Sequence, residues 1–119
     1  MSENTFFPIR SWSEDDKPRE KLLLKGKTAL SNAELIAILI GSGSRNESAV
    51  SLSQRILASV DFNLNALGKL SVNQLNHFKG IGDAKAITIQ AAMELGRRRR
   101  LEAAVELQKI TSSKTIFDI

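Results

Sequence analysis

The segment KGIGDAK, from Lys79 to Lys85, contains the residue types that bind an oxyanion. Gly80 and Gly82 carry no side chain, so an oxygen atom can approach the backbone amides closely. The apolar period that follows predicts a helix from Asp83, and the first turn of a helix has amide groups without partners inside the helix. These amides and the helix dipole favour a bound anion. We therefore expect a phosphate site here, with the two lysines adding charge.

Two other residues of this segment affect the expected site. Ile81, between the glycines, should point back between two helices as a wedge, and its amide belongs to the expected phosphate donors. Asp83 should cap the second helix, so its carboxylate competes for the same donors. The alternative is a hairpin that serves packing alone.

The elements around this segment are predicted from apolar spacing. Leu75 and Phe78 precede the hairpin and Ala86 and Ile89 follow it, at intervals that place all four toward a common core. The small Ala86 lets the two helices cross closely. The segment is thus a helix, a tight hairpin and a second helix.

An earlier stretch repeats this pattern. LSNAEL from residue 30 matches LSVNQL from residue 70, and both have the spacing of a capping box. Each predicted helix ends in Gly-x-Gly, and another helix follows. We interpret this as an internal duplication, with units at about 31–60 and 71–100.

The first copy departs from the second at its hairpin. Ser42 replaces the apolar wedge between Gly41 and Gly43, and a longer loop follows. These residues, with Arg45 nearby, could bind a second phosphate. The preferred interpretation is a degenerate structural partner.

The chain as a whole is predicted to be all-α. Its 119 residues suit one domain, and scarce aromatic residues, 5% of the chain, argue against sheets. We expect a small bundle of five or six short helices built on the tandem pair. The predicted parts are an N-terminal arm (1–17) with a solvated acidic patch at 13–16, a helical domain (18–109), and a linker or start of a second domain (110–119).

Composition excludes several classes of function. There is no cysteine and only one histidine, His77, so we expect no metal site and no catalytic residues in this chain. The longest apolar run is too short to span a bilayer, and a cytoplasmic protein without a membrane partner is expected. The net charge of +4 is compatible with a polyanion partner.

Four consecutive arginines begin at Arg97. On a helix their side chains point almost all the way round, so at most two can face one nucleic-acid backbone. Arg97 and Arg98 are therefore candidates for secondary contacts. The alternative is that the arginines are solvated or paired with Glu94 and Glu102.

The pattern around residues 75–89 resembles the helix–hairpin–helix motif of many DNA repair proteins, which bind DNA without sequence specificity. In proteins with this motif the hairpin amides hold one backbone phosphate, and a monovalent cation sometimes bridges hairpin carbonyls and phosphate. The resemblance implies DNA contacts from Lys79, Gly80, Ile81, Gly82 and Lys85. It implies no other cofactor.

A wider resemblance covers nearly the whole chain after residue 8. PREKLL from residue 18, LS from residue 30, ELIAIL from residue 34 and Gly41-x-Gly43 follow one another as in the N-terminal region of the RadC family. That family carries the label of DNA repair protein, and its C-terminal domain resembles JAB/MPN-type zinc metalloproteases. ITSSKTIFDI, from residue 110, is similar to the entry to that second domain. Ser42 and Asp83 depart mildly from the family pattern.

Together these features predict a DNA-binding module without catalysis. The expected partners are DNA, bound weakly and in a salt-sensitive way through its backbone, and the protein's own C-terminal domain. The alternative is a protein-interaction or regulatory domain for that absent zinc metalloprotease-like domain. The sequence does not indicate an oligomeric state.

Overall fold

The computed structural model describes residues 14–118, with side chains as far as Thr111, and its regular elements are helical. The elements are η2 (Glu14–Asp16), α2 (Lys17–Lys25), η3 (Lys27–Ala29), α3 (Asn32–Ile40), α4 (Ala49–Ser59), α5 (Leu64–Gly68), α6 (Val72–Asn76) and α7 (Asp83–Asp118). No β-strand occurs within residues 14–118, so the predicted all-α class is confirmed. Most of the predicted N-terminal arm, residues 1–13, lies outside the described residues.

Both predicted capping boxes are present. The Ser31 hydroxyl accepts a hydrogen bond from the Glu34 amide at 3.2 Å, and the Glu34 carboxylate accepts one from the Ser31 amide at 2.8 Å. Ser71 and Gln74 make the same pair of bonds at 3.1 and 2.9 Å. Each box provides acceptors for amides that have none inside the helix. The two stretches that are similar in sequence therefore begin their helices in the same way.

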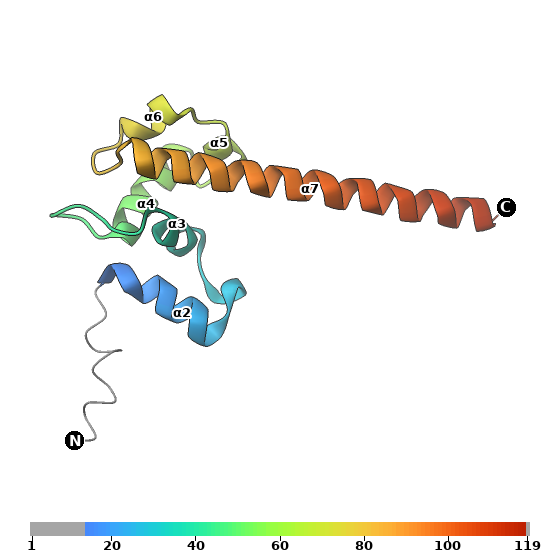
Figure 1. The fold of residues 1–119 in the computed structure, drawn as a ribbon, viewed down its shortest axis with the longest axis horizontal. Coiled ribbons are helices and arrows are strands. Elements are labelled where there is room, and N and C mark those ends of the chain that lie inside the picture. Colours follow the sequence, from blue (N-terminus) through green and yellow to red (C-terminus); the bar gives the residue numbers. More distant parts are fainter. Residues whose placement is uncertain (1–13, 119) are drawn as a thin grey trace, which may run out of the picture.

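The helices form two units that pack against each other (Figure 1). In the first unit α3 packs on α4, and in the second α6 packs on α7. Contacts between α3 and α7 join the units, while α2 packs on α3 and α5 on α7. This arrangement brings the connection between α3 and α4 close to the connection between α6 and α7.

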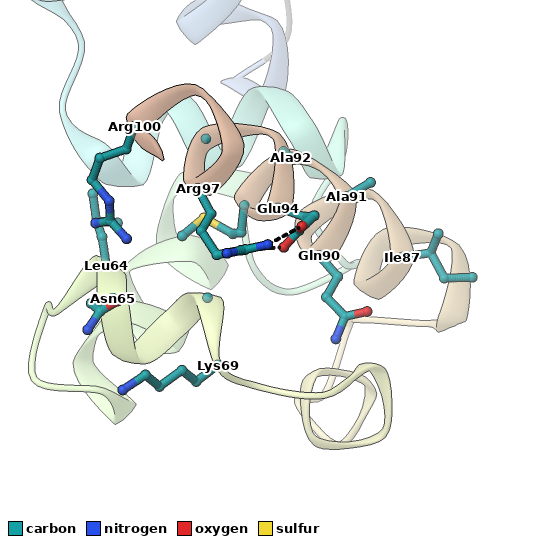
Figure 2. Close-up of a pocket in the computed structure, with 13 residues that line it drawn as sticks. Leu64, Asn65, Lys69, Ile87, Gln90, Ala91, Ala92, Glu94, Arg97 and Arg100 are labelled. Carbon is teal, nitrogen blue, oxygen red and sulfur yellow. Dashed lines mark hydrogen bonds and ion pairs between the residues drawn. The ribbon is translucent and has the colours of Figure 1, made fainter. Parts of the chain in front are cut away.

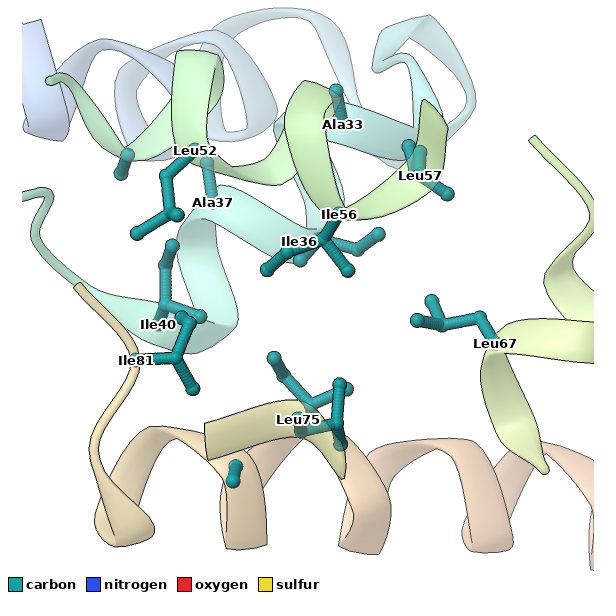
Figure 3. Close-up of a cluster of buried hydrophobic side chains, with 13 residues drawn as sticks. Ala33, Ile36, Ala37, Ile40, Leu52, Ile56, Leu57, Leu67, Leu75 and Ile81 are labelled. Atoms are coloured by element: carbon teal, nitrogen blue, oxygen red, sulfur yellow. The ribbon is translucent and has the colours of Figure 1, made fainter. Parts of the chain in front are cut away.

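The core lies between the two units (Figure 3). Ile81 is 4% exposed and belongs to the same buried cluster as Ile40, so the predicted wedge is confirmed. Leu75, Ala86 and Ile89 are completely buried, as their spacing predicted. Burying a large aliphatic side chain contributes roughly 1.5–3 kcal/mol, so the second hairpin is anchored by its own central residue.

Glycine is needed at the first position of each Gly-x-Gly segment because of backbone conformation. Gly41 has a φ of +80° and Gly80 has a φ of +96°, in the region that side chains disfavour. Gly41 also ends α3, where its amide donates to the Ala37 carbonyl at 3.0 Å. Both Gly-x-Gly segments therefore begin with a glycine of positive φ, although α6 itself ends earlier, at Asn76.

The last helix is much longer than expected. α7 has 36 residues, and Figure 1 shows it extending well beyond the other helices. The helical domain was expected to end at residue 109, but α7 continues to Asp118, because no glycine or proline follows Gly96 and β-branched or serine residues cost only about 0.5 kcal/mol each in a helix. The Thr111 hydroxyl donates to the Leu107 carbonyl at 2.9 Å, which satisfies it within the helix. The domain boundary suggested at 110 stays a prediction.

Candidate nucleic-acid interface

The second hairpin, which we define as residues 77–82, leaves backbone donors open at its junction with α7. Among the described residues, no acceptor faces the amides of Gly82, Asp83 or Ala84. The Ile81 amide is occupied, since it donates to the Phe78 carbonyl at 3.0 Å. A Cβ added at Gly82 would meet no atom within 4 Å. The donors at the start of α7 therefore border open space, as an oxyanion site requires.

Asp83 does not compete for these donors. Its carboxylate accepts a hydrogen bond from the Asn76 side-chain amide at 2.6 Å, and no described backbone amide donates to it. Asp83 is itself the first residue of α7, so it lies beyond the capping position predicted for it. The expected cap is wrong, and its correction removes the internal competitor that the sequence suggested.

The two flanking lysines differ in their surroundings. The Lys85 ammonium donates to the Ser42 carbonyl at 2.7 Å and contacts the Gly80 carbonyl at 3.5 Å. It therefore links the two connections and has only part of its hydrogen-bonding capacity left. Lys79 is exposed, and no described residue pairs with its ammonium group. Of the two, Lys79 is the cation that an incoming ligand meets first.

Arg55 makes a second link that the sequence did not reveal. Its guanidinium binds the Glu47 carboxylate through two nitrogens at 2.9 and 3.2 Å and donates to the Lys79 carbonyl at 2.7 Å. The hydrogen bond from Arg55 lowers the pKa of Glu47 below its ordinary value. Arg55 thus holds the second hairpin against α4. The carbonyls of Lys79 and Gly80 already accept protein hydrogen bonds, and the monovalent cation predicted there stays a prediction.

The first hairpin, which we define as residues 41–48, already holds an anion. Asp15 accepts hydrogen bonds from the Gly43 amide at 3.0 Å and from the Ala49 amide at 2.7 Å, one through each carboxylate oxygen. The predicted solvated acidic patch is therefore wrong at this residue. No local pattern signals the contact, because 28 residues separate Asp15 from Gly43.

The remaining predicted residues of the first hairpin lie at its surface. Ser42 is exposed, so it does not repeat the wedge that Ile81 forms. Arg45 is exposed at the tip of a tight turn in which Ser44 and Glu47 exchange backbone hydrogen bonds at 2.8 and 3.3 Å. A Cβ at Gly43 would lie 2.0 Å from the Glu47 carbonyl oxygen, so this glycine is required by the turn.

The arginine run is partly paired, as the alternative interpretation expected. Glu94 accepts hydrogen bonds from Arg97 at 2.9 and 3.0 Å and from Arg98 at 2.9 Å. The hydrogen bonds from Arg97 and then Arg98 lower the pKa of Glu94 to about 2. One carboxylate thus offsets part of their combined charge, and their secondary DNA contacts stay a prediction.

A groove of about 710 Å³ lies between α5 and α7 (Figure 2). Leu64, Ile87 and Met93 contribute apolar surface to it. Lys69 and Arg100 contribute positive charge at its edges. The sequence did not predict this groove, because α5 and α7 are separated by α6 and the second hairpin along the chain.

Neither a metal-binding cluster nor a membrane-spanning helix is present in the part of the chain that the structure describes. No cluster of three His, Cys, Asp or Glu side chains with metal-binding geometry occurs there. None of the described helices is both long and apolar enough to cross a membrane. The expected lack of a metal, the lack of catalysis and the cytoplasmic location stay predictions.

The fold and site define a helical domain of two packed units, each made of two helices joined by a Gly-x-Gly connection. In the first unit Asp15 accepts hydrogen bonds from two amides, and in the second the amides of Gly82, Asp83 and Ala84 have no acceptor among the described residues. A family described as UPF0758 N-terminal matches residues 9–87, and the chain belongs to this family. UPF0758 is the RadC-like family, so the resemblance found in the sequence is confirmed at family level.

The chain is also similar to full-length relatives. It is 70% identical over 117 residues to the UPF0758 protein of Flavobacterium johnsoniae. This alignment covers 98% of this chain and 51% of the relative. It is 43% identical over 110 residues to the Porphyromonas gingivalis UPF0758 protein, and this alignment covers 92% of this chain and 48% of the relative. The chain thus spans about half the length of these relatives. No solved structure matches it.

Proposed function

We propose that this chain is a DNA-binding module that contacts backbone phosphates through residues 79–85 and does not read base sequence. The observation that carries the proposal is the open set of amides at Gly82, Asp83 and Ala84, which face no acceptor among the described residues. An exposed Lys79 beside them adds positive charge. Backbone amides at a helix start are a well-suited phosphate site.

The physical character of such binding follows from its chemistry. Phosphates are the same at every base pair, so contacts to them position the protein without specifying sequence. With two or three phosphates neutralised, the logarithm of affinity should fall with the logarithm of salt concentration at a slope of about −2 to −3. The RadC resemblance, with its helix–hairpin–helix motif, supports DNA as the source of the phosphate.

The sharpest test replaces Gly82 with alanine. A Cβ there meets nothing within 4 Å, and Gly82 does not have a positive φ, so the fold should tolerate the methyl group. The methyl group would crowd an oxyanion at the adjacent amides, and affinity for duplex DNA should fall about tenfold or more, a loss of about 1.4 kcal/mol. Fluorescence anisotropy with labelled duplex at two salt concentrations measures it.

Gly96→Ala is the matched control for this variant. Gly96 also has open space around it, but it lies along α7 away from the hairpin. We expect unchanged DNA affinity in Gly96→Ala. Equal affinity in the wild type and Gly82→Ala would remove the hairpin from the interface.

A charge reversal tests the lysine. Lys79→Glu should weaken DNA binding and make the salt slope about one unit shallower, because one phosphate contact is lost. Lys27→Glu is the control, because Lys27 is exposed in η3 and its substitution changes the net charge by the same amount. Lys85 is less suitable for this test because it also links the two connections. If both variants weaken binding equally, the effect is one of net charge and not of the hairpin.

A second candidate function, a docking domain for another part of the full-length protein, is favoured by α7. Leu101, Val105, Leu107 and Ile110 are exposed along this helix, and relatives are about twice as long as this chain. The RadC resemblance implies a zinc metalloprotease-like domain as the occupant. Hydrogen exchange of α7 should then be slower in a full-length relative than in this chain. The same result with no DNA binding at low salt would favour docking over the first proposal.

A further inference from the structure

In each hairpin unit, the second glycine of Gly-x-Gly and the first residue of the next helix offer backbone amides as donors, and the two units differ in whether these amides have acceptors. In the first unit the second glycine of Gly-x-Gly, Gly43, and the first residue of the next helix, Ala49, both donate to Asp15. In the second unit the residues in these two places are Gly82 and Asp83. Among the described residues neither of their amides has an acceptor.

We propose that Asp15 is a built-in substitute for a phosphate group, which fills the first hairpin and keeps DNA phosphates out of it. The part of this inference that concerns DNA rests on the proposed function. The carboxylate reaches both donors at once, with one oxygen 3.0 Å from the Gly43 nitrogen and the other 2.7 Å from the Ala49 nitrogen. A phosphate would need the same two donors and would be repelled by the carboxylate charge.

The fold holds Asp15 in this place. Asp15 lies in η2, which leads directly into α2 and packs on both α3 and α4. An acid fixed within the chain competes with a free anion at a high effective concentration. The first hairpin is therefore closed in the folded chain, and only the second is open to a ligand.

The first experiment uses inorganic phosphate and does not depend on DNA. Asp15→Ala leaves the Gly43 and Ala49 amides without their acceptor, so its melting temperature in chloride should be lower than that of the wild type. Phosphate at the same ionic strength should restore a large part of the loss, because it can occupy the vacated donors. The wild type should show no comparable gain.

Glu14→Ala is the matched control. It also removes one acid from η2, but the Glu14 carboxylate pairs with Lys17 at 2.8 Å and makes no hydrogen bond or ion pair with the described residues of the hairpin. We expect its melting temperature to respond to phosphate as the wild type does. A lack of phosphate response in Asp15→Ala, or an equal response in Glu14→Ala, would overturn the proposal.

The second experiment measures the salt dependence of DNA binding. Asp15→Ala should steepen the slope by about one unit relative to the wild type and Glu14→Ala, because one more phosphate is engaged. If Asp15→Ala does not fold, Asp15→Asn retains the size of the side chain while removing its charge, and it should steepen the slope in the same direction. An unchanged slope in the folded variant overturns the proposal.

The two experiments separate failure of this inference from failure of the proposed function. If the wild type does not bind DNA but phosphate restores the melting temperature of Asp15→Ala, the proposed DNA function fails. The inference that Asp15 occupies an anion site is then retained. If the wild type binds DNA but Asp15→Ala shows neither a phosphate response nor a steeper salt dependence, the DNA function is retained. The inference that Asp15 substitutes for a phosphate then fails.

Discussion

The two hairpins share a backbone plan and differ at the positions that decide whether they can bind a ligand. In both, the Gly-x-Gly segment begins with a glycine of positive φ, Gly41 or Gly80. The first hairpin then exposes Ser42 and donates a hydrogen bond from the Gly43 amide to Asp15. The second buries Ile81 and leaves its junction with α7 open.

This difference shows that two units with the same backbone plan can satisfy their donors in different ways. The first hairpin satisfies its donors within the chain, which ties η2 to α4 and stabilises the fold. The second hairpin obtains its stability from an apolar side chain instead, so its polar donors at the helix start are not needed for folding. Separating anchoring from anion binding leaves the second hairpin available to an external ligand.

The largest expected effect comes from the central residue of each hairpin. Ile81→Ala should lower the free energy of unfolding by about 2–5 kcal/mol, because it leaves a cavity beside Ile40. Ser42→Ala should change it by less than about 0.5 kcal/mol, since Ser42 is exposed. Urea unfolding followed by circular dichroism measures both. Similar losses in the two variants would mean that the hairpins are anchored alike.

The second glycine of each hairpin should give opposite results. Gly43→Ala places a Cβ 2.0 Å from the Glu47 carbonyl oxygen, and the resulting shift of backbone should cost about 1–3 kcal/mol or more. Gly82→Ala should raise stability by about 0.4–1 kcal/mol through the entropy of the unfolded chain. Thermal melts of both proteins check the sign. A lower melting temperature in Gly82→Ala would show that the added methyl group meets other atoms in the folded protein.

The two capping boxes should contribute equally. Ser31→Ala and Ser71→Ala each remove a hydroxyl acceptor at a helix start, at a cost of about 1 kcal/mol. Chemical denaturation of the two single variants gives the comparison, with Ser31→Thr and Ser71→Thr as variants that keep the hydroxyl group. If only one of the two alanine variants loses stability, the two capping boxes do not contribute equally.

The smallest expected effect is a difference between the two capping boxes in their response to pH. The backbone hydrogen bond from Ser31, followed by the Lys21 ammonium, lowers the pKa of Glu34 below 4.5. This depressed pKa contributes stability that is fully present above about 4.5 and is lost as the pH falls through the lowered value. The Ser31 amide resonance should therefore shift in acid, whereas that of Ser71 should not shift with it, because its partner Gln74 does not titrate.

Glu34→Gln is the control for this titration. It keeps an oxygen acceptor for the Ser31 amide and removes the titrating group, so the acid shift at Ser31 should disappear. If the shift persists in this variant, it has another source than the capping box.

Much of the fold follows from local signals in the sequence. The capping serines and the glycines at 41 and 80 act through neighbours a few residues away, and each was predicted. Burial of Ile81 was also predicted from its place between two glycines, although its partner Ile40 lies far away in sequence. The end of α7 was not, because weak helix formers after residue 110 lower helix propensity without stopping the helix.

The candidate site was predictable only in part. The sequence identified the second hairpin but assigned Asp83 to a cap, although its carboxylate binds Asn76 instead. It also treated Lys85 as a free cation, although the Ser42 carbonyl, 43 residues away, accepts its hydrogen bond. Arg55 was not selected at all, since its contact with the Lys79 carbonyl spans 24 residues. Such contacts depend on how the two units pack.

The sequence by itself determined that this chain forms helices joined by two glycine hairpins, because caps, turns and apolar periods depend on spacing along the chain. The sequence favoured the second hairpin as the phosphate site, but only the tertiary structure decided that an acid of the chain itself fills the first. The packing of η2 on α3 and α4 brings the Asp15 carboxylate to the amides of the first hairpin, and no described residue reaches the open amides of the second in the same way. Both outcomes depend on distances in space that spacing along the chain does not set.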